Sequence, residues 1–463
     1  MLPISNRDPC LRAQAEAALG RATGAPLSAG NKVDLLIDAP QHYACWQEAI
    51  TGAKHSIRLE NYIFANDSVG QDFLGLLCER AKAGLRVRLI IDWLGTQNLK
   101  GRSFWKAFLN AGGEVRFFNP FHFNEPFGWV SRDHRKLLVV DGQWASVSGV
   151  CIASQWLGQP QRGIAPWRDT GVRISGPAVH GLVQAFESTW NSLGASEPIQ
   201  DPELTEQGTV ALRVIASTPA SASMFRLDHL VATLAEQRLW IADAYFVAMP
   251  SYVQALSAAA RDGVDVRLLI PGSSDLRAVA AIGRLGYRSL LEAGVRVFEW
   301  NGSMMHAKTA VADDRWSRIG SSNLNISSWL ANLEIDVAIE DSGFAECMAA
   351  QYLTDLGNAT ELLLAGRRAR PLPGVALPKR PRQRGSSGRT AAGALRLANT
   401  VGATLLPQRN MGHSERGLLT NTALILLALG VLGLFKPAWL AWPLSAVMIW
   451  IGLSLAWKRL RKP

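Results

Sequence analysis

Two short segments of this chain carry the same pattern of residues at a fixed separation. They read "DHRKLLVVDGQW" (133–144) and "MHAKTAVADDRW" (305–316), and both contain H-x-K-x-x-x-x-D at a spacing of 172 residues. The matching positions are His134, Lys136 and Asp141 in the first copy, and His306, Lys308 and Asp313 in the second. One copy arises easily by chance, but two copies that each run into an apolar, strand-like segment indicate an internal duplication.

The sequence before each motif is repeated as well. The strand-like "HSIRLENYIF" leads into the helical run "DFLGLLCERAKAGLRVRLIID", and "QRLWIADAYF" leads into "SYVQALSAAARDGVDVRLLIP". Each pair reads as strand, helix, glycine turn and strand, which is typical of a β-α-β unit. Tyr62 and Tyr245 lie at the ends of matched strands, where they either line a site or pack in the core.

These repeats predict an α/β protein built from two homologous halves that pack pseudo-symmetrically. Each half should contain a mainly buried sheet covered by helices. We place an N-terminal segment at residues 1–29, the first half at residues 30–200 and the second half at residues 208–362.

The motif spacing suggests what each half presents. Successive side chains of a strand alternate between its faces, so a histidine and a lysine two residues apart should point the same way. Imidazole serves as a nucleophile or as a general acid and base near neutral pH, and ammonium is a point charge suited to phosphate. The aspartate, five residues after the lysine, either orients a reacting group or caps a turn, and the structural role is the more common. We nevertheless include Asp141 and Asp313 with the histidines and lysines as candidate catalytic residues.

One half supplies one histidine, whereas double displacement at phosphorus needs a nucleophile and an acid for the leaving oxygen. If the halves face each other, His134 and His306 converge on one phosphate. One attacks to form a phosphohistidine, the other moves the protons, and the two lysines stabilise the developing charge. This chemistry requires no metal or cofactor, and we see no Asp/Glu cluster with metal-ligand spacing.

The paired motifs resemble those of the phospholipase D superfamily. The segment "GSSNLNISSWLANLEIDVAIED" resembles the G-S-x-N segment and the following glutamate of that family. The segment "WRDTGVRISGPAVHGLVQAFESTW" resembles the one that closes the first half of bacterial cardiolipin synthases. The resemblance covers residues 30–362.

The resemblance implies roles for three further residues. Asn323 would bind phosphate beside the lysine of the second motif. Each motif histidine would donate a ring N–H to a carboxylate, His306 to Glu334 and His134 to Asp169. Such a partner fixes the tautomer and leaves the other ring nitrogen free to react.

The first half departs from the family pattern at one position. Cys151 stands opposite Asn323, where family members usually keep asparagine in both halves. A thiol is a weak donor and does not replace an amide. We therefore expect an asymmetric phosphate site, and we interpret Cys151 as a small buried residue rather than a catalytic thiol.

The charge of the chain is concentrated in its C-terminal part. Residues 366–463 hold 16 Lys and Arg and a single acid, Glu415, whereas the rest holds 32 basic and 37 acidic residues. A slightly acidic body is a poor match for a nucleic-acid groove, so we expect no nucleic-acid partner.

The C-terminal part also predicts a membrane anchor. Residues 417–435 and 437–457 are free of charge and long enough to cross a bilayer as a helical hairpin. Basic residues flank both outer ends, which places these ends and the body in the cytoplasm. Residues 366–416 read as a basic linker, either solvated or held near anionic lipid, with an interfacial helix near its end.

Cysteine usage and the first residues agree with this location. The five cysteines are scattered without a C-x-x-C pair, which argues against a disulfide framework or a zinc site. The first twenty residues contain no apolar core of a signal peptide, so we expect none. We predict a multi-pass protein of the inner (cytoplasmic) membrane.

Two functions share every catalytic residue. The leading hypothesis is a cardiolipin synthase-type phosphatidyltransferase that uses phosphatidylglycerol, with phosphatidylglycerol or phosphatidylethanolamine as the donor. The alternative is a membrane-bound phospholipase D that passes the intermediate to water and yields phosphatidic acid. A nucleic-acid phosphodiesterase is less favoured. The motifs do not distinguish the two histidines as nucleophile and acid, and they do not fix the oligomeric state.

Overall fold

The computed structural model describes most of the body of the chain. Its described residues are 9–96, 102–120, 131–195, 197–219, 221–247, 249–364 and 370–371, together with isolated positions between 427 and 453. The chain divides into two compact units. The first comprises Met1–Phe118 and Ser131–Ser386 and contains the elements from α1 to β16, and the second comprises Asn119–Val130 and Ser387–Pro463.

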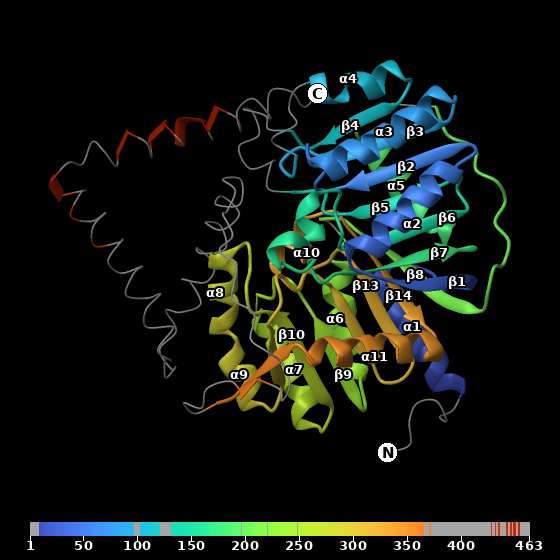
Figure 1. The fold of residues 1–463 in the computed structure, drawn as a ribbon. Helices are drawn as coiled ribbons and strands as arrows, with labels where there is room; N and C mark the ends of the chain where they lie inside the picture. The colour runs from blue at the N-terminus through green and yellow to red at the C-terminus, as the bar shows by residue number, and fades with distance from the viewer. Residues whose placement is uncertain are drawn as a thin grey trace. The chain divides into compact units, whose positions relative to one another are not determined.

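The first half of the chain alternates strands and helices (Figure 1). Its strands are β1 (Ser28–Ile37), β2 (Ser56–Asn61), β3 (Arg86–Asp92), β4 (Glu114–Phe118), β5 (Lys136–Val140), β6 (Trp144–Ser148) and β7 (Thr170–Ser175). Its helices are α1 (Pro9–Thr23), α2 (Asp38–Gly52), α3 (Ser68–Lys82), α4 (Arg102–Asn110) and α5 (Val179–Ser192), with the 3-10 turns η4 (Ser154–Leu157) and η5 (Pro160–Arg162).

The second half repeats this order and adds two strands. Its strands are β8 (Val210–Ser217), β9 (Arg238–Ala242), β10 (Asp265–Pro271), β11 (Arg296–Trp300), β12 (Thr309–Ala312), β13 (Trp316–Gly320), β14 (Glu334–Glu340), β15 (Ala359–Leu362) and β16 (Arg370–Pro371). Its helices are α6 (Ser223–Leu234), α7 (Pro250–Arg261), α8 (Arg277–Leu285), α9 (Tyr287–Glu292), α10 (Ile326–Leu330) and α11 (Ser342–Leu356).

All the strands belong to one sheet, whose order displays the duplication. The first half runs β1-β7-β6-β5-β2-β3-β4, and the second runs β8-β14-β13-β12-β9-β10-β11 before β15 and β16. The halves join where β1 and β8 pair antiparallel, with Ser28 opposite Leu212 and Asn31 opposite Val210. The predicted α/β class and the duplication are therefore confirmed.

The strands form because their apolar runs are buried on both faces. In β5 and β12 every residue is buried, and in β3 only Arg86 is exposed. Runs of this kind are typical of central strands covered on both sides, where each fully buried Val, Leu or Ile contributes about 1.5–3 kcal/mol.

Three clusters of apolar side chains build the core. One cluster unites the halves, since it joins residues of β5–β7 and α5 with residues of β12–β14 and α11. The others lie under the outer helices, α2 to α4 in the first half and α6, α7 and α9 in the second. Within this shared cluster, β6 and β7 of the first half contact β13 and β14 of the second half.

The predicted membrane anchor lies outside the described residues. The linker at 366–416 and the spans at 417–435 and 437–457 include few described positions, and residues 1–8 are likewise not described. Among the residues that the structure does describe, no helix combines the length and the apolarity needed to cross a bilayer. The hairpin therefore stays a prediction.

Candidate active site

The motif histidines lie at the starts of two equivalent strands, just outside the strands themselves. His134 precedes β5 and His306 precedes β12, each in an extended segment. The lysine of each motif folds back onto the carbonyl oxygen of its own histidine: Lys136 Nζ donates to His134 O at 2.5 Å, and Lys308 Nζ donates to His306 O. The predicted pairing of histidine and lysine on one side of each segment therefore holds, although only Lys136 is part of a strand.

Backbone hydrogen bonds hold each histidine against the other half. His134 N donates to Leu333 O at 2.9 Å, and Leu333 N donates to Arg132 O at 2.8 Å. In the equivalent place, His306 N donates to Arg168 O at 2.7 Å, and Arg168 N donates to Met304 O at 2.8 Å. These two short parallel bridges place the residue that follows Leu333 or Arg168 beside a histidine of the opposite half.

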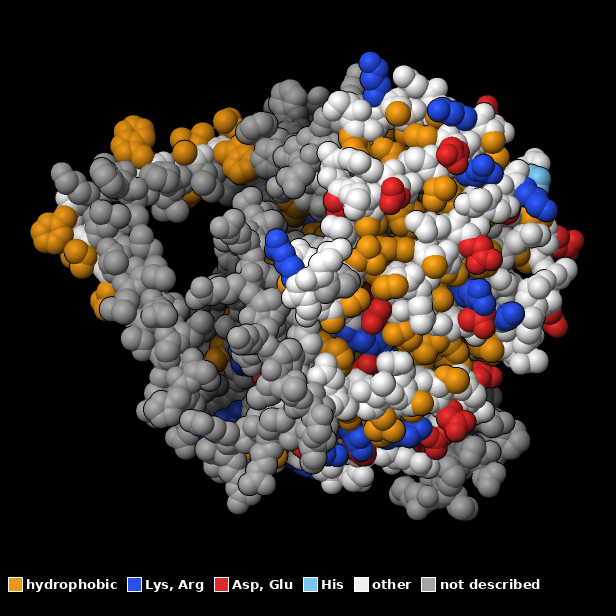
Figure 2. All heavy atoms as spheres, viewed as in Figure 1, with side chains coloured by type: hydrophobic (Ala, Val, Ile, Leu, Met, Phe, Trp, Pro, Cys, Tyr) orange, Lys and Arg blue, Asp and Glu red, His pale blue; other side chains and the backbone are white. Residues whose placement is uncertain are grey.

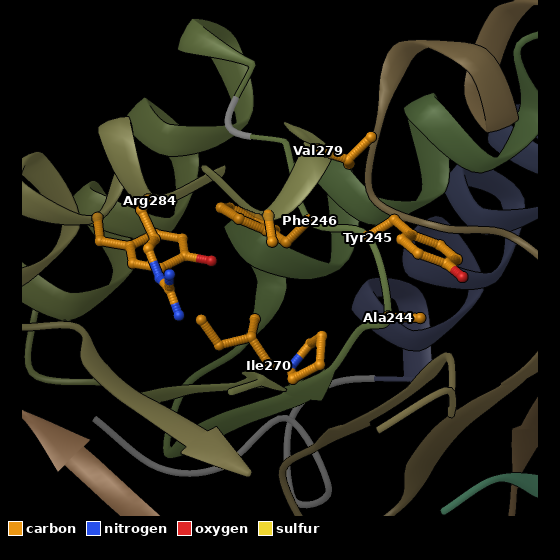
Figure 3. Close-up of a pocket in the computed structure, with 9 residues that line it drawn as sticks. Ala244, Tyr245, Phe246, Ile270, Val279 and Arg284 are labelled. Carbon is orange, nitrogen blue, oxygen red and sulfur yellow. The ribbon is translucent and has the colours of Figure 1, made fainter. Parts of the chain in front are cut away.

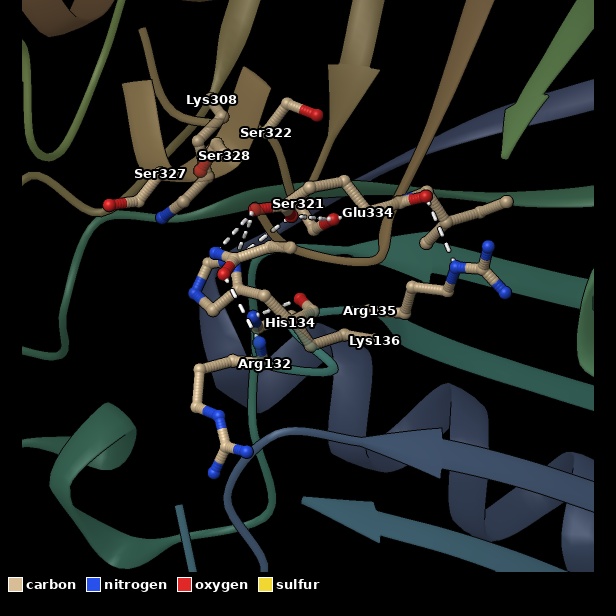
Figure 4. Close-up of polar contacts among 12 residues, drawn as sticks. Arg132, His134, Arg135, Lys136, Lys308, Ser321, Ser322, Ser327, Ser328 and Glu334 are labelled. Atoms are coloured by element: carbon tan, nitrogen blue, oxygen red, sulfur yellow. Dashed lines mark hydrogen bonds and ion pairs between the residues drawn. The ribbon is translucent and has the colours of Figure 1, made fainter. Parts of the chain in front are cut away.

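The carboxylates are consequently exchanged between the halves, and Figure 4 shows the pair of His134 and Glu334. His134 Nδ1 lies 2.9 Å from Glu334 Oε2, and His306 Nδ1 lies 2.7 Å from Asp169 Oδ2. The predicted assignment of Glu334 to His306 and of Asp169 to His134 was wrong. Within one half, β6 lies between β5 and β7, so Asp169 is held about two strand spacings, roughly 10 Å, from His134.

Each carboxylate has further donors that the motif analysis did not identify. Glu334 accepts from Ser321 Oγ at 2.5 Å and from Asn332 Nδ2 at 3.3 Å. Asp169 accepts from Trp156 Nε1 at 3.1 Å and from its neighbour Thr170 N at 2.8 Å. Ser321 lies within the G-S-x-N segment and was recognisable there, whereas nothing in the sequence distinguished Trp156.

Two buried arginines beside the motifs also brace the halves and were missed. Arg135 Nε donates to Glu334 O at 3.1 Å and its Nη1 donates to Thr189 Oγ1 at 2.9 Å. Arg168 Nε donates to Asp355 Oδ1 at 2.7 Å, which ties the Asp169 segment to α11. Arg135 lies between His134 and Lys136, and Arg168 lies directly before Asp169, so both stand among other polar residues and no pattern in the sequence distinguished them.

The surroundings hold both imidazoles neutral. Burial lowers the pKa of His134 to about 4. Burial and the nearby charge of Lys308 lower the pKa of His306 to about 3. Burial acts to raise the pKa of Asp169 and Glu334, but hydrogen bonds from the histidines and the charges of the lysines outweigh it, so both carboxyls have a lowered pKa. At neutral pH each Nδ1–H therefore points to a carboxylate, and each Nε2 carries a lone pair.

The lysines lie in an equally enclosed environment. Lys136 is 1% exposed and its Nζ lies 5.3 Å from the ring centre of Tyr62. Lys308 is fully buried, its Nζ lies 5.8 Å from the ring centre of Tyr245, and burial lowers its pKa to about 8. The two tyrosines that end matched strands thus line the site.

Asn323 and Cys151, which occupy matching positions of the two halves, are both buried but offer different groups to a ligand. Asn323 is 3% exposed, and its Oδ1 has no hydrogen-bond partner among the described residues. Cys151 is buried, and burial raises the pKa of its thiol, so the thiol stays neutral. The first half therefore lacks an amide at this point, as predicted.

The aspartates of the motifs lie away from the reacting groups. Asp141 accepts the backbone N–H of Lys54, His55 and Ser56 at 2.7–2.9 Å. Asp313 accepts those of three residues at the start of β9 at 2.8–3.3 Å. Both follow the far ends of β5 and β12 at positive φ, about 16 Å along the strand from the lysine. Grouping them with the catalytic residues was a wrong interpretation, because they fix strand entry.

A small hollow lies beside Tyr245 (Figure 3). It is lined mainly by apolar side chains, including Phe246, Ile270 and Val279, with Arg284 at its edge. Its volume of about 10 Å³ leaves room for at most one water molecule. Across the part of the chain that the structure describes, no three His, Cys, Asp or Glu side chains are grouped so that they could hold a metal ion.

Comparison with known proteins gives consistent results. The family model described as "Cardiolipin synthase, PLD-like domain" matches residues 47–190 and 231–356. Cardiolipin synthase A of Pseudomonas aeruginosa (strain LESB58) is 33% identical over 365 residues, which cover 76% of this chain and 72% of that protein. Cardiolipin synthase 1 of Staphylococcus aureus (strain COL) is 32% identical over 359 residues, which cover 75% and 71%.

A solved structure shares the fold. The crystal structure of phosphatidylserine synthase from Haemophilus influenzae Rd KW20 superposes with a TM-score of 0.57 at 15% identity, over 75% of this chain and 92% of that one.

Proposed function

The chain belongs to the cardiolipin synthase, PLD-like domain family, and we propose that it forms cardiolipin by moving a phosphatidyl group between phospholipids through a phosphohistidine. The observation that carries the proposal is the exchange of carboxylates between the halves. Each imidazole is oriented by a carboxylate of the opposite half, and each is close enough to the buried lysine of the opposite half for that charge to lower its pKa, which supports one shared site.

In the first step, Nε2 of one imidazole attacks the phosphorus of the donor lipid. The P–N bond forms as the bond from phosphorus to the leaving alkoxide breaks, and the second imidazole supplies the proton for that alkoxide. This second imidazole must therefore be protonated, and the negative charge of the bound phosphate offsets the burial that otherwise lowers its pKa.

In the second step, the acceptor is the glycerol hydroxyl of phosphatidylglycerol. Its oxygen bonds to phosphorus, the P–N bond breaks, and its proton passes to the second imidazole. Lys136 and Lys308 balance the charge on the phosphoryl oxygens in both steps, and Asn323 adds an amide donor from the second half alone. The chain itself supplies every group that this cycle requires.

The lipid substrates fit what the body of the chain presents. In the face viewed in Figure 2, Lys and Arg side chains alternate with Asp and Glu over the described surface. The described residues of this face therefore form no basic stripe of the kind that nucleic-acid recognition needs. We infer that the predicted hairpin holds this body at the cytoplasmic membrane, where donor, acceptor and product all lie.

Lipid analysis tests the function directly. The chain is expressed in a bacterium without cardiolipin synthases, and membrane lipids are measured by mass spectrometry. We expect cardiolipin, and accumulation of phosphatidic acid without cardiolipin would support the hydrolase instead. His134→Ala and His306→Ala should each abolish the product, while the control His180→Ala, at an exposed position of α5, should not. Full activity of either site variant would contradict a shared site.

A further inference from the structure

The two histidine–carboxylate pairs are equivalent by topology but differ in their surroundings. Along the 172-residue repeat, three positions that follow β6 in the first half match polar residues that follow β13 in the second. These positions are Gly149, Cys151 and Trp156, opposite Ser321, Asn323 and Ser328. The first half thus presents glycine, thiol and indole where the second presents hydroxyl and amide groups.

Trp156 substitutes for the serine that its half cannot accommodate. A Cβ atom added at Gly149 would lie 2.3 Å from Asp169 Oδ1, so a counterpart of Ser321 does not fit. The donor to the carboxylate comes instead from Trp156 Nε1, at 3.1 Å from Asp169 Oδ2. Both halves therefore hold the carboxylate with a side-chain donor, but one half uses an aspartate, a glycine and a tryptophan where the other uses a glutamate and a serine.

The same tryptophan helps to enclose His306 in aromatic rings. The ring centre of His306 lies 5.3 Å from Trp156, 5.5 Å from Trp167 and 5.9 Å from Tyr245. Trp156 and Trp167 also contact each other at 4.7 Å and are 1% and 4% exposed. By contrast, His134 has Tyr62 at 5.0 Å, and its side chain is 12% exposed against 5% for His306.

This enclosure bears on the fate of the phosphatidyl group. In the second step a water molecule competes with the lipid hydroxyl, since either oxygen can bond to phosphorus while the P–N bond breaks and its proton passes to the free imidazole. His306 is one of the two imidazoles in that step, whichever role it takes. Indole rings offer no acceptor for water, and the one N–H of Trp156 is already committed to Asp169. Exclusion of water protects reactive intermediates from hydrolysis.

We propose that Trp156 and Trp167 are specificity-determining residues that exclude water from the His306 side of the site, so that the phosphatidyl group passes to a lipid hydroxyl. This inference rests on the proposed function and deepens it. Trp156 has a second, positioning role, because it holds the carboxylate that orients His306.

The test measures two products of the full chain in vesicles of phosphatidylglycerol. In Trp167→Leu, the ratio of phosphatidic acid to cardiolipin should rise by about tenfold or more, the scale set by a contact in an apolar pocket. Trp156→Ser, which copies the second half, should raise the ratio similarly. Trp156→Phe keeps a ring but removes the N–H, so total turnover should fall and its pH profile should shift with little change in the ratio.

Trp105→Phe is the control, since this tryptophan of α4 is 1% exposed and its ring contacts are with Phe64, Phe104 and Phe117 rather than with a motif histidine. It should leave the ratio unchanged. If Trp167→Leu does not fold, Trp167→Met provides the same measurement. An unchanged ratio in a folded Trp167 variant would overturn the inference, whereas a wild-type chain that makes no cardiolipin would overturn the proposed function.

Discussion

Replacing Glu334 by glutamine removes the charge that faces His134 while nearly preserving side-chain volume. The carboxylate accepts from His134 Nδ1 at 2.9 Å, and it belongs to the opposite half of the chain. Asp169→Asn makes the matching change at His306, where the distance is 2.7 Å. The two variants therefore test separately which histidine each carboxylate serves.

The size of the effect follows from the geometry. With charge centres about 4 Å apart and an effective dielectric constant of about 20, an imidazolium and a carboxylate attract by about 4 kcal/mol. Loss of this attraction lowers the pKa of His134 still further, because the protonated ring loses the charge that opposes the effect of burial. Steps in which His134 carries a proton should slow by about a thousandfold.

Two measurements check the variant. Cardiolipin formation gives kcat, and NMR of histidines labelled with ¹⁵N gives the tautomer and titration of each ring. In the wild type, both site histidines should carry the proton on Nδ1. In Glu334→Gln we expect the signals of His134 to change, because an amide can donate to Nδ1, while those of His306 stay. Asp169→Asn should give the reverse.

The reasoning would be refuted by either of two results. One is a change at His306 rather than His134 in Glu334→Gln, since the pairing would then run within each half. The other is a decrease in kcat of less than about tenfold, because the carboxylate would then contribute little to proton transfer.

Three further predictions concern stability and pH. Asp141→Ala or Asp313→Ala should lower the free energy of unfolding by about 1–3 kcal/mol through backbone N–H groups left without an acceptor, and denaturant titration should show this while the folded fraction keeps its specific activity. Binding of inorganic vanadate near pH 6 should be accompanied by uptake of protons, since an anion raises the lowered pKa of the site histidines. Calorimetry in buffers of different ionisation enthalpy should detect this uptake, and a release of protons would contradict the prediction. Burial lowers the pKa of Lys308 to about 8, so its charge is present below that pH and lost above it, and kcat/KM should fall above pH 8. Lys308→Arg should remove this decrease at alkaline pH, because arginine stays charged. An unchanged decrease in the variant would exclude Lys308 as its source.

The duplication could be predicted from the sequence because it repeats local sequence patterns. The same order of apolar runs, glycine turns and motif residues occurs twice, and the two halves accordingly share one strand order. The role of Asp141 was also within reach, because an aspartate directly after a strand often caps a turn.

The exchange of carboxylates between the halves could not be predicted from the sequence, for a physical reason. Pairing within a half and pairing between halves place the same residues in the same repeat, so the sequence pattern is identical for both. Only the position of β6 between β5 and β7, and the bridges from Leu333 and Arg168 to the opposite motif, decide between them. Trp156 was hidden for a related reason, since its repeat counterpart is Ser328 and its contact with His306 arises only when the halves pack.

The exchange also determines when the enzyme becomes reactive during its own synthesis. A chain that has folded only its first half has His134 without Glu334, and Asp169 without His306. An unfinished or partly unfolded copy therefore holds no complete pair with which to cleave a phospholipid. We therefore expect lipid chemistry to start only when both halves have closed on each other.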